Sequence, residues 1–375
     1  MIDRDELFGR LRRRPDVEDA TLQAHDASDA LILDEAAKLR ASLGEVVVIG
    51  DRHGALTLGA LHAGATHVRV HQDSIVGERA LEANVAELGP VSPHGAGFTH
   101  HGLDASLVEG ATLVLLQLPR SLDALDEIAE LIATHADDAV RVVAGGRVKH
   151  MSMSMTALLG RSFRHVHASL GWRKSRVLHA ERPLRPGISW PRARTHEIAS
   201  RSQAVVAHGA AFAGTSVDIG AQTLLAHLDA MPDASHAIDL ACGTGVLGIA
   251  LALARPQTQV LATDASAAAI ASTLASAAAN GVADRLDARQ ADGLEGVPDA
   301  SARLIVLNPP FHVGAAVHTG AASRLIADAG RALAPGGELW CVWNSHLGYR
   351  PLLDRVGATR QVSRNPKFTV TATRR

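Results

Sequence analysis

The sequence predicts an α/β fold built from two doubly wound domains in tandem. Short apolar runs, such as VVVIG at 46–50 and LIVLN at 304–308, alternate with stretches of helical length. Wholly apolar strands of this kind are covered on both faces, as in parallel sheets joined by crossover helices. The order of elements in the first half then repeats in the second. A chain of 375 residues, 47% of them hydrophobic, is long and apolar enough to bury two such cores.

The second half gives the clearer order of elements. It opens with a strand at 237–240, a glycine-containing turn and a helix that ends near 254. The elements expected next are a strand ending at Asp264, an alanine-rich helix ending at Asn280-Gly281, an apolar strand at 303–308, a helix around 321–333 and a strand at 336–344. The end of the chain predicts two strands joined at Asn365-Pro366, which would form an antiparallel hairpin at the sheet edge.

The first half follows the same order with altered details. Its expected elements are a strand, turn and helix at 45–64, a strand ending at Asp73, a helix carrying Asn84, an apolar strand at 112–117, a helix at 121–136 and a strand at 139–147. When the sequences of the two halves are aligned, Gln117-Leu118-Pro119-Arg120 corresponds to Asn308-Pro309-Pro310-Phe311. We expect a domain of residues 1–185 and a domain of residues 186–375, joined within the arginine- and proline-rich stretch ERPLRPGISWPRAR.

Charge is distributed unevenly along a chain of net charge −2. Residues 141–201 hold 13 basic and 2 acidic residues, whereas residues 1–140 hold 11 basic and 24 acidic ones. A strongly basic segment predicts contact with a phosphate backbone, and Arg173, Lys174 and Arg176 are the candidate contacts. The alternative is a solvated connector that pairs with the acidic first half.

The composition argues against several classes of protein. No stretch reaches the 18 or so apolar residues of a membrane helix, and the first residues contain no signal-peptide core. Two cysteines cannot form a disulfide framework, so we expect a cytoplasmic protein. The 20 histidines lie at no zinc-ligand spacing with cysteines or carboxylates, so we expect no metal.

The segment DLACGTG at 239–245 places glycines between a strand and a helix. Gly243 and Gly245 let the backbone approach a ligand, and the helix N-terminus offers free N–H groups. Asp264 ends the next strand, where an acid can accept hydrogen bonds from ribose hydroxyls. Asp292 follows the third strand and is a candidate for contact with an adenine amino group; the alternative is an exposed turn residue.

The turn Asn308-Pro309-Pro310-Phe311-His312 carries the most specific signal. Its prolines fix the backbone, so the Asn308 side-chain oxygen and the Pro309 carbonyl become two rigid acceptors for an –NH2 group. Holding both hydrogens favours a pyramidal, nucleophilic nitrogen, and Phe311 offers a face for a flat substrate. His312 is a candidate contact to the base or its phosphate.

Together the glycine loop, the acidic end of the second strand and the N-P-P-[FY] turn resemble the class I S-adenosylmethionine-dependent methyltransferases that act on an exocyclic or amide nitrogen. The form NPPFH, on a chain whose first half is a degenerate copy of its second, resembles the two-domain ribosomal RNA guanine-N2 methyltransferases of bacteria. The likeness covers most of the chain and is strongest over about 205–345. It implies two Rossmann-like methyltransferase domains, the first non-catalytic and involved in RNA recognition, and the second catalytic.

The resemblance also assigns roles to residues of the second domain. It implies that Asp239, Ala241, Gly243 and Gly245 surround the methionine part of the cofactor, with Asp264 on the ribose and Asp292 near the adenine. Asn308, Pro309, Pro310 and Phe311 would hold a guanine of 16S or 23S rRNA. The stretch with Phe212, Asp218 and Gly220 would border the cofactor pocket. Ala241 departs from the glycine of many relatives, and an alanine fits there if its φ is negative.

Other functions remain open from the sequence alone. The same turn serves methyl transfer to adenine N6 or to a protein glutamine amide. A nicotinamide oxidoreductase would use the glycine loop and Asp264 but not the Asn-Pro-Pro turn. A non-catalytic RNA-binding scaffold would not need an intact Asn308 site. The expected partner is ribosomal RNA or a ribosomal subunit, with a monomer as the expected state.

Overall fold

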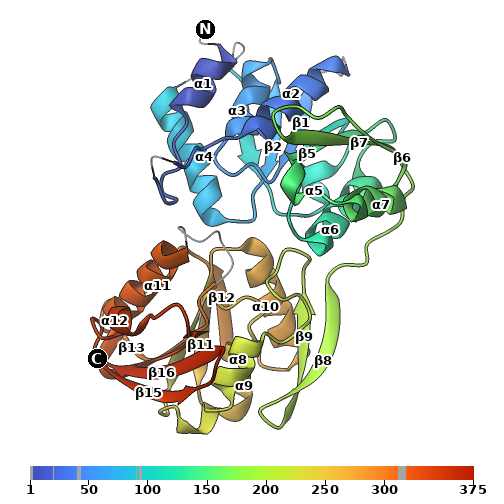
Figure 1. Cartoon of the computed structure of the whole chain (residues 1–375). Coiled ribbons are helices and arrows are strands. Elements are labelled where there is room, and N and C mark those ends of the chain that lie inside the picture. The colour runs from blue at the N-terminus through green and yellow to red at the C-terminus, as the bar shows by residue number, and fades with distance from the viewer. Residues whose placement is uncertain (1–2, 20, 40–43, 90, 93–94, 311–317) are drawn as a thin grey trace. The chain divides into compact units, whose positions relative to one another are not determined.

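The computed structural model describes residues 3–19, 21–39, 44–89, 91–92, 95–310 and 318–375. The chain divides into two compact units, Met1–Trp190 and Pro191–Arg375, which we call the N-terminal and C-terminal units. The division lies just beyond the boundary expected at 185. Each unit contains one seven-stranded sheet flanked by helices (Figure 1).

The C-terminal sheet has the strand order β12-β11-β10-β13-β14-β16-β15. Its strands are β10 (His236–Leu240), β11 (Gln259–Asp264), β12 (Leu286–Gln290), β13 (Ala302–Leu307), β14 (Leu333–Asn344), β15 (Ala358–Arg364) and β16 (Phe368–Arg374). Its helices are α8 (Ile219–Leu225), the short η2 (Leu228–Ala230), α9 (Val246–Ala254), α10 (Ala267–Ala279), α11 (His318–Ala332) and α12 (Arg350–Leu353). Strand β16 runs antiparallel to both of its neighbours, which confirms the predicted edge hairpin.

The N-terminal sheet has the matching order β3-β2-β1-β4-β5-β7-β6. Its strands are β1 (Glu45–Ile49), β2 (His67–His71), β3 (Gly97–His100), β4 (Leu113–Gln117), β5 (Arg141–Arg147), β6 (Phe163–Ala168) and β7 (Ser175–Pro183). Its helices are α1 (Arg4–Arg10), α2 (Ala27–Lys38), α3 (Ala55–His62), α4 (Ile75–Leu88), α5 (Ala105–Val108), α6 (Leu122–His135), the short η1 (Val148–His150) and α7 (Met153–Ser162). The two tandem doubly wound domains are therefore confirmed.

The edge hairpin of the N-terminal unit, β6–β7, was not predicted, because its sequence is dominated by arginines and histidines. It turns at Arg173 and Lys174, whose φ angles of 44° and 61° belong to the tight two-residue turn that suits twisted hairpins. Strand β7 continues to Pro183 and β8 (Arg192–Ile198) begins soon after. Regular structure therefore extends further into the expected joint than its prolines indicated.

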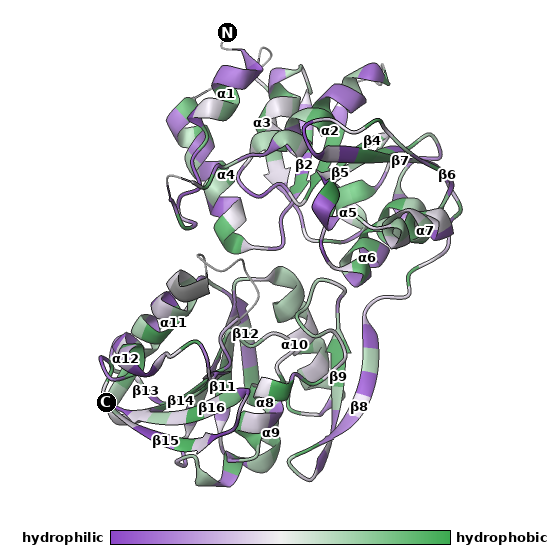
Figure 2. Ribbon diagram, viewed as in Figure 1, coloured by the Kyte–Doolittle hydropathy of each residue, from purple (hydrophilic) through white to green (hydrophobic). Residues whose placement is uncertain are grey.

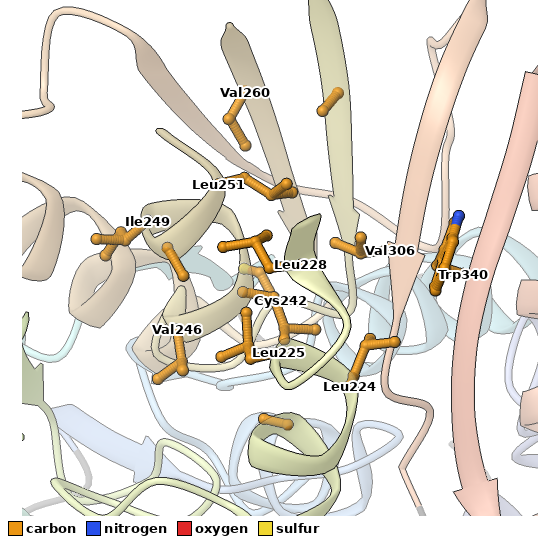
Figure 3. Packing of buried hydrophobic residues seen from close by; sticks show 14 of the residues in the cluster. Leu224, Leu225, Leu228, Cys242, Val246, Ile249, Leu251, Val260, Val306 and Trp340 are labelled. Carbon is orange, nitrogen blue, oxygen red and sulfur yellow. The ribbon is translucent and has the colours of Figure 1, made fainter. Parts of the chain in front are cut away.

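The alternation of side chains along the C-terminal strands produces two cores. Val306 and Trp340 face one side, where they pack with α8 and α9, as Figure 3 shows. Their neighbours Leu307 and Cys341 face the other side and pack against α11 and α12. Because successive residues of a strand point to opposite faces, apolar side chains at every position require helices on both sides. Figure 2 shows the resulting hydrophobic strands.

A separate hairpin, formed by β8 and β9 (Arg201–Ala207), docks on a helix instead of a sheet. The side chains of Ser276 and Asn280 bind the backbone of β9: Val206 donates to Ser276 Oγ at 2.9 Å, Ser276 Oγ donates to the Val206 carbonyl at 3.0 Å, and Ala204 donates to Asn280 Oδ1 at 2.9 Å. Ser272 accepts the next bond, from His208 N at 2.9 Å. Spacing of four residues places all three side chains on one face of α10. This contact fixes the chain just before α8.

Replacing Ser276 with alanine should destabilise the C-terminal unit by about 1–3 kcal/mol, because it leaves both polar groups of Val206 without their partner. Ser216 is exposed, and Ser216→Ala serves as the matched control with an expected change below about 0.5 kcal/mol. Urea denaturation of both variants measures the difference. Equal stabilities would show that the helix does not hold β9.

Candidate active site

The ends of four parallel strands bring the predicted site residues together. In the sheet register Leu240 of β10 pairs with Thr263 of β11 and with Leu307 of β13, and Asp264 of β11 pairs with Gln290 of β12. The loops after these strands therefore begin at one edge. They carry the predicted site residues Ala241, Gly243, Gly245, Asp264, Asp292, Asn308, Pro309 and Pro310. The carboxyl edge of such a sheet is where doubly wound folds bind ligands.

The loop after β10 turns with three residues in the left-handed region. Ala241, Gly243 and Gly245 have φ angles of 57°, 57° and 76°. The condition under which an alanine was expected to fit here, a negative φ, is not met: Ala241 adopts the conformation that glycine normally supplies, at a cost of about 1–2 kcal/mol. Gly245 also needs to be small, because a Cβ there would lie 2.8 Å from Cγ2 of Thr273.

Asp264 organises this loop directly. Its Oδ2 accepts the backbone N–H of Gly243 at 3.0 Å, and its Oδ1 accepts that of Ser266 at 2.9 Å. A Cβ built on Gly243 meets no described atom within 4 Å, so open space adjoins the loop. This space and the half-buried carboxylate fit a ribose-bearing cofactor.

Asp239 lies beneath the loop and is fully buried. Its Oδ2 accepts the N–H of Gly248 at 2.7 Å, and its Oδ1 has no hydrogen-bond partner among the described residues. Burial raises the pKa of this carboxyl to about 7, opposed by the Gly248 hydrogen bond and assisted by the negative charge of Asp264. The side chain therefore holds the start of α9 in place and leaves one acceptor available.

Asp292 lies just after β12 and is partly exposed. Its carboxylate is 3.8 Å from the guanidinium of Arg324 on α11. An exposed ion pair of this length contributes little stability. The residue is at the predicted edge of the sheet, and its contact with an adenine remains a prediction.

Asn308 follows β13, and its side-chain amide has a fixed orientation. Its Nδ2 donates to Oδ2 of Asp218 at 2.9 Å, whereas its buried Oδ1 has no partner among the described residues. A carboxylate can only accept, so Asp218 holds the amide with the oxygen turned away from itself. Gly220 provides the necessary room, because a Cβ there would lie 3.0 Å from Oδ1 of Asn308.

Asp218 also caps α8 by accepting the N–H of Ala221 at 3.2 Å. Sequence reasoning placed Asp218 beside the cofactor pocket but missed its contact with Asn308. The only signal in the sequence was an acid immediately before a helix. That pattern predicts a helix cap but does not predict contact with a residue ninety positions away.

Pro309 is buried and Pro310 is exposed. Phe311 and His312 lie outside the described residues.

Arg173, Lys174 and Arg176 lie at the turn of the β6–β7 hairpin in the N-terminal unit and are exposed. The guanidinium of Arg173 lies 4.6 Å from the ring centre of Trp172, which is itself partly exposed. The hairpin thus presents a cation stacked on an aromatic ring, a combination that suits a nucleic acid strand.

The N-terminal sheet has lost the corresponding cofactor features. The register aligns Gln72 with Asp264, Arg52 with Gly243 and Val48 with Asp239. Gln72 folds back and donates to the Asp51 carbonyl at 2.7 Å, in the place where an acid would meet a ribose. Gln117 takes the place of Asn308, as the alignment of the two half-sequences predicted.

Neither a membrane helix nor a metal cluster emerges from the described part of the chain. None of its helices is long and apolar enough to cross a membrane. The same residues contain no group of three or more histidine, cysteine, aspartate or glutamate side chains placed to hold a metal ion.

The strand order, the glycine loop, the acid at the end of β11 and the Asn-Pro-Pro turn at one edge define a class I S-adenosylmethionine-dependent methyltransferase. Residues 202–372 match the family described as "Methyltransferase small domain", and residues 3–183 match "RLMG N-terminal domain". The chain is 36% identical over 369 residues to ribosomal RNA large subunit methyltransferase G of Streptomyces coelicolor, with 96% of each covered. It is 35% identical over 375 residues to the protein of that name from Pseudomonas aeruginosa, again with 96% of each covered. The chain belongs to the ribosomal RNA large subunit methyltransferase G family.

A solved structure shares the fold. The T. thermophilus 16S rRNA N2 methyltransferase RsmC, in complex with AdoMet and guanosine, matches with a TM-score of 0.76 at 21% identity and covers 94% of this chain and 92% of that one. Membership of a methyltransferase family decides against the oxidoreductase and scaffold alternatives.

Replacing Ala241 with glycine should stabilise the C-terminal unit by about 1 kcal/mol, because it removes the cost of a left-handed alanine. Ala250→Gly within helix α9 is the matched control and should destabilise by about 1 kcal/mol. Chemical denaturation of both variants without ligand measures whether the free energy of unfolding rises in the first variant and falls in the second. A loss of stability in both would mean that Ala241 carries no strain.

Proposed function

We propose that this protein transfers a methyl group from S-adenosylmethionine to the exocyclic N2 of one guanine in large-subunit ribosomal RNA. The observation that carries the proposal is the buried, unpartnered Oδ1 of Asn308, held in place by Asp218 at the carboxyl edge of the sheet. The names of the Streptomyces and Pseudomonas relatives support the large-subunit RNA. The N2 activity in the name of the solved structure supports the target atom.

The residues present fit the cofactor. Asp264 and the loop from Ala241 to Gly245 would hold S-adenosylmethionine, with Asp239 beneath them and Asp292 near the adenine. When bound, this cofactor supplies an electrophilic methyl carbon. The open space beside Gly243 and the unpartnered Oδ1 of Asp239 are the structural features that accommodate it.

The chain's own residues prepare the nucleophile. Asn308 Oδ1 and the Pro309 carbonyl accept the two hydrogens of N2, which turns the nitrogen lone pair out of the plane of the base. Pro309 and Pro310 keep these acceptors rigid, so little reorganisation is needed. Phe311 would provide the face on which the guanine stacks, and His312 would contact the base or its phosphate; both remain predictions from the sequence. As N2 takes the methyl group, the bond from that carbon to sulfur would break with its electron pair left on sulfur, so S-adenosylhomocysteine would be the product. The methylated N2 is then positively charged and acidic, and one proton leaves to water without a strong base.

The roles of the two units follow from the same features. The C-terminal unit is catalytic, whereas the N-terminal unit binds no cofactor, because Gln72 and Arg52 replace the acid and the glycine that the cofactor would need. It recognises RNA, in part through Arg173, Lys174 and Arg176. The substrate places the reaction in the cytoplasm, and the two fused units work as a monomer.

Asn308→Ala should lower methyl transfer to large-subunit RNA by on the order of 10²–10³-fold with cofactor affinity nearly unchanged, because only the acceptor for the substrate is lost. Asp264→Ala should show the opposite pattern and weaken cofactor binding first. Calorimetric titration and transfer of labelled methyl groups separate the two effects. Unchanged turnover of the Asn308 variant would eliminate the proposed acceptor.

Exchanging Arg173, Lys174 and Arg176 together for glutamine should weaken RNA binding and reduce its salt slope by about 2, because each phosphate contact to a single strand contributes about 0.7. Filter binding across a series of salt concentrations measures both quantities. If the salt slope equals that of the unmodified protein, the hairpin does not contact RNA phosphates and is only a solvated surface element.

A further inference from the structure

A pocket of about 450 Å³ lies at the carboxyl edge of the N-terminal sheet, in the position where the C-terminal sheet has its active site. Residues that follow β1, β4 and β5 line it, together with the start of α2. Its size is that of a small-molecule site. The residues that would bind the cofactor are replaced here, but a cavity remains at the same edge of the sheet, and different side chains line it.

Five basic residues from three separate loops surround this pocket, and we call them the basic rim. They are Arg52 after β1, Arg120 after β4, and Arg147, Lys149 and His150 at the end of β5 and in η1. None of the five has a carboxylate partner among the described residues. The pKa of His150 is lowered by burial and then by the charges of Arg120, Lys149, Arg52 and Arg147, so each of these cations lies near enough to His150 to disfavour its protonation. Such a cluster is stabilised by an anion.

The three acids that line the pocket are Asp26, Asp29 and Asp51. They form hydrogen bonds within the N-terminal unit and, in the part of the chain that the structure describes, no ion pair with the basic rim. Asp26 accepts the backbone N–H of Ser28 at 2.6 Å. Asp51 accepts the backbone N–H groups of Gly54 at 3.0 Å and Thr57 at 2.8 Å. Asp29 accepts the N–H of Asp26 at 2.7 Å and the amide of Gln117, and burial raises its pKa to about 7. These carboxyls therefore serve the fold beneath the pocket.

Gln117 repeats the arrangement of Asn308 on this floor. Its Nε2 donates to Asp29 Oδ1, as the Asn308 amide donates to Asp218. Its Oε1 lies 3.3 Å from the hydroxyl of Ser28, which is buried and also donates to Oδ1 of Asp26. An amide oxygen and a hydroxyl at the base of a pocket can form hydrogen bonds with the edge of a nucleobase. The pocket thus joins a polar floor of base-binding character to a cationic rim.

We propose that this pocket binds one unpaired nucleotide of the RNA substrate, with its phosphate on the basic rim and its base directed toward Gln117 and Ser28. The inference rests on the proposed function, which makes RNA the substrate. Arg52 replaces the glycine of the cofactor loop, so the site repels a cationic sulfonium compound and attracts a polyanion. The second site would hold the RNA while the C-terminal unit modifies a different nucleotide.

The test exchanges Arg52, Arg120 and Arg147 for glutamine in the full chain. The probe is a fluorescently labelled, unstructured RNA dodecamer, and its affinity should fall about fivefold near 0.1 M salt with a decrease of about 0.7 in the salt slope, the contribution of one phosphate on a single strand. The control for charge exchanges three exposed arginines near the amino edge of the C-terminal sheet, Arg303, Arg355 and Arg374. A rim variant that binds RNA like this control would overturn the proposal.

Leu118→Trp fills the pocket without changing the charge, since Leu118 is half-buried and lines it. This variant should also weaken binding of the dodecamer. If circular dichroism shows that the triple variant is unfolded, the Leu118 variant provides the test instead. Unchanged affinity would contradict entry of a base. Guanosine monophosphate alone is the second probe: saturable binding of the mononucleotide, with RNA affinity insensitive to the rim, would assign the pocket to a free nucleotide and overturn the proposal.

Two further measurements keep this inference separate from the proposed function. Cofactor affinity and methyl transfer depend on the C-terminal unit, so both are measured for every variant. Loss of RNA affinity in the rim variant, with no N2-methylguanine formed even by the unmodified protein, would refute the proposed function and support the pocket. Normal methylation with RNA affinity unaffected by either pocket variant would refute the pocket alone.

Discussion

The hydrogen bond between Asp218 and Asn308 is the contact on which the proposed chemistry depends. An asparagine amide has a donor end and an acceptor end of nearly equal size, and only its surroundings decide which one faces a ligand. A carboxylate at 2.9 Å from Nδ2 makes that decision, so the buried Oδ1 is presented as an acceptor. The contact joins the cap of α8 to the turn after β13. The docking of β9 on α10 holds the chain that leads into α8 and so supports this geometry indirectly.

Much of this architecture could be predicted from the sequence, because parallel strands covered on both faces are apolar at every position. Strand–turn–helix segments, the acid at the end of β11 and the Asn-Pro-Pro turn are local patterns, and the sheet register brings them to one edge as expected. The edge hairpin at Asn365-Pro366 was also predictable, because its turn residues precede a segment rich in β-branched residues, FTVTATR.

The rest depends on contacts that no local pattern encodes. The bond from Asn308 to Asp218 spans ninety residues, and β9 docks on a serine and asparagine stripe of α10 that appears in the sequence only as a good helix. The sequence shows an alanine at 241 but not its backbone conformation, and the loop after β10 places it in the left-handed region that alanine normally avoids. The β6–β7 hairpin was missed because arginines and histidines interrupt the apolar residues of both strands, although β7 is largely buried.

The two units show how one fold can serve two purposes once a few residues at the strand ends change. Their strand orders match, but Gln72 and Arg52 stand where the C-terminal unit has Asp264 and Gly243. Mass mapping of methylated nucleosides in large-subunit RNA from cells that lack this protein is the most direct test of the proposed function. We expect one N2-methylguanosine to disappear and the intact gene to restore it. A complete set of N2-methylguanosines, with a methyl group missing from any other atom, would contradict that function.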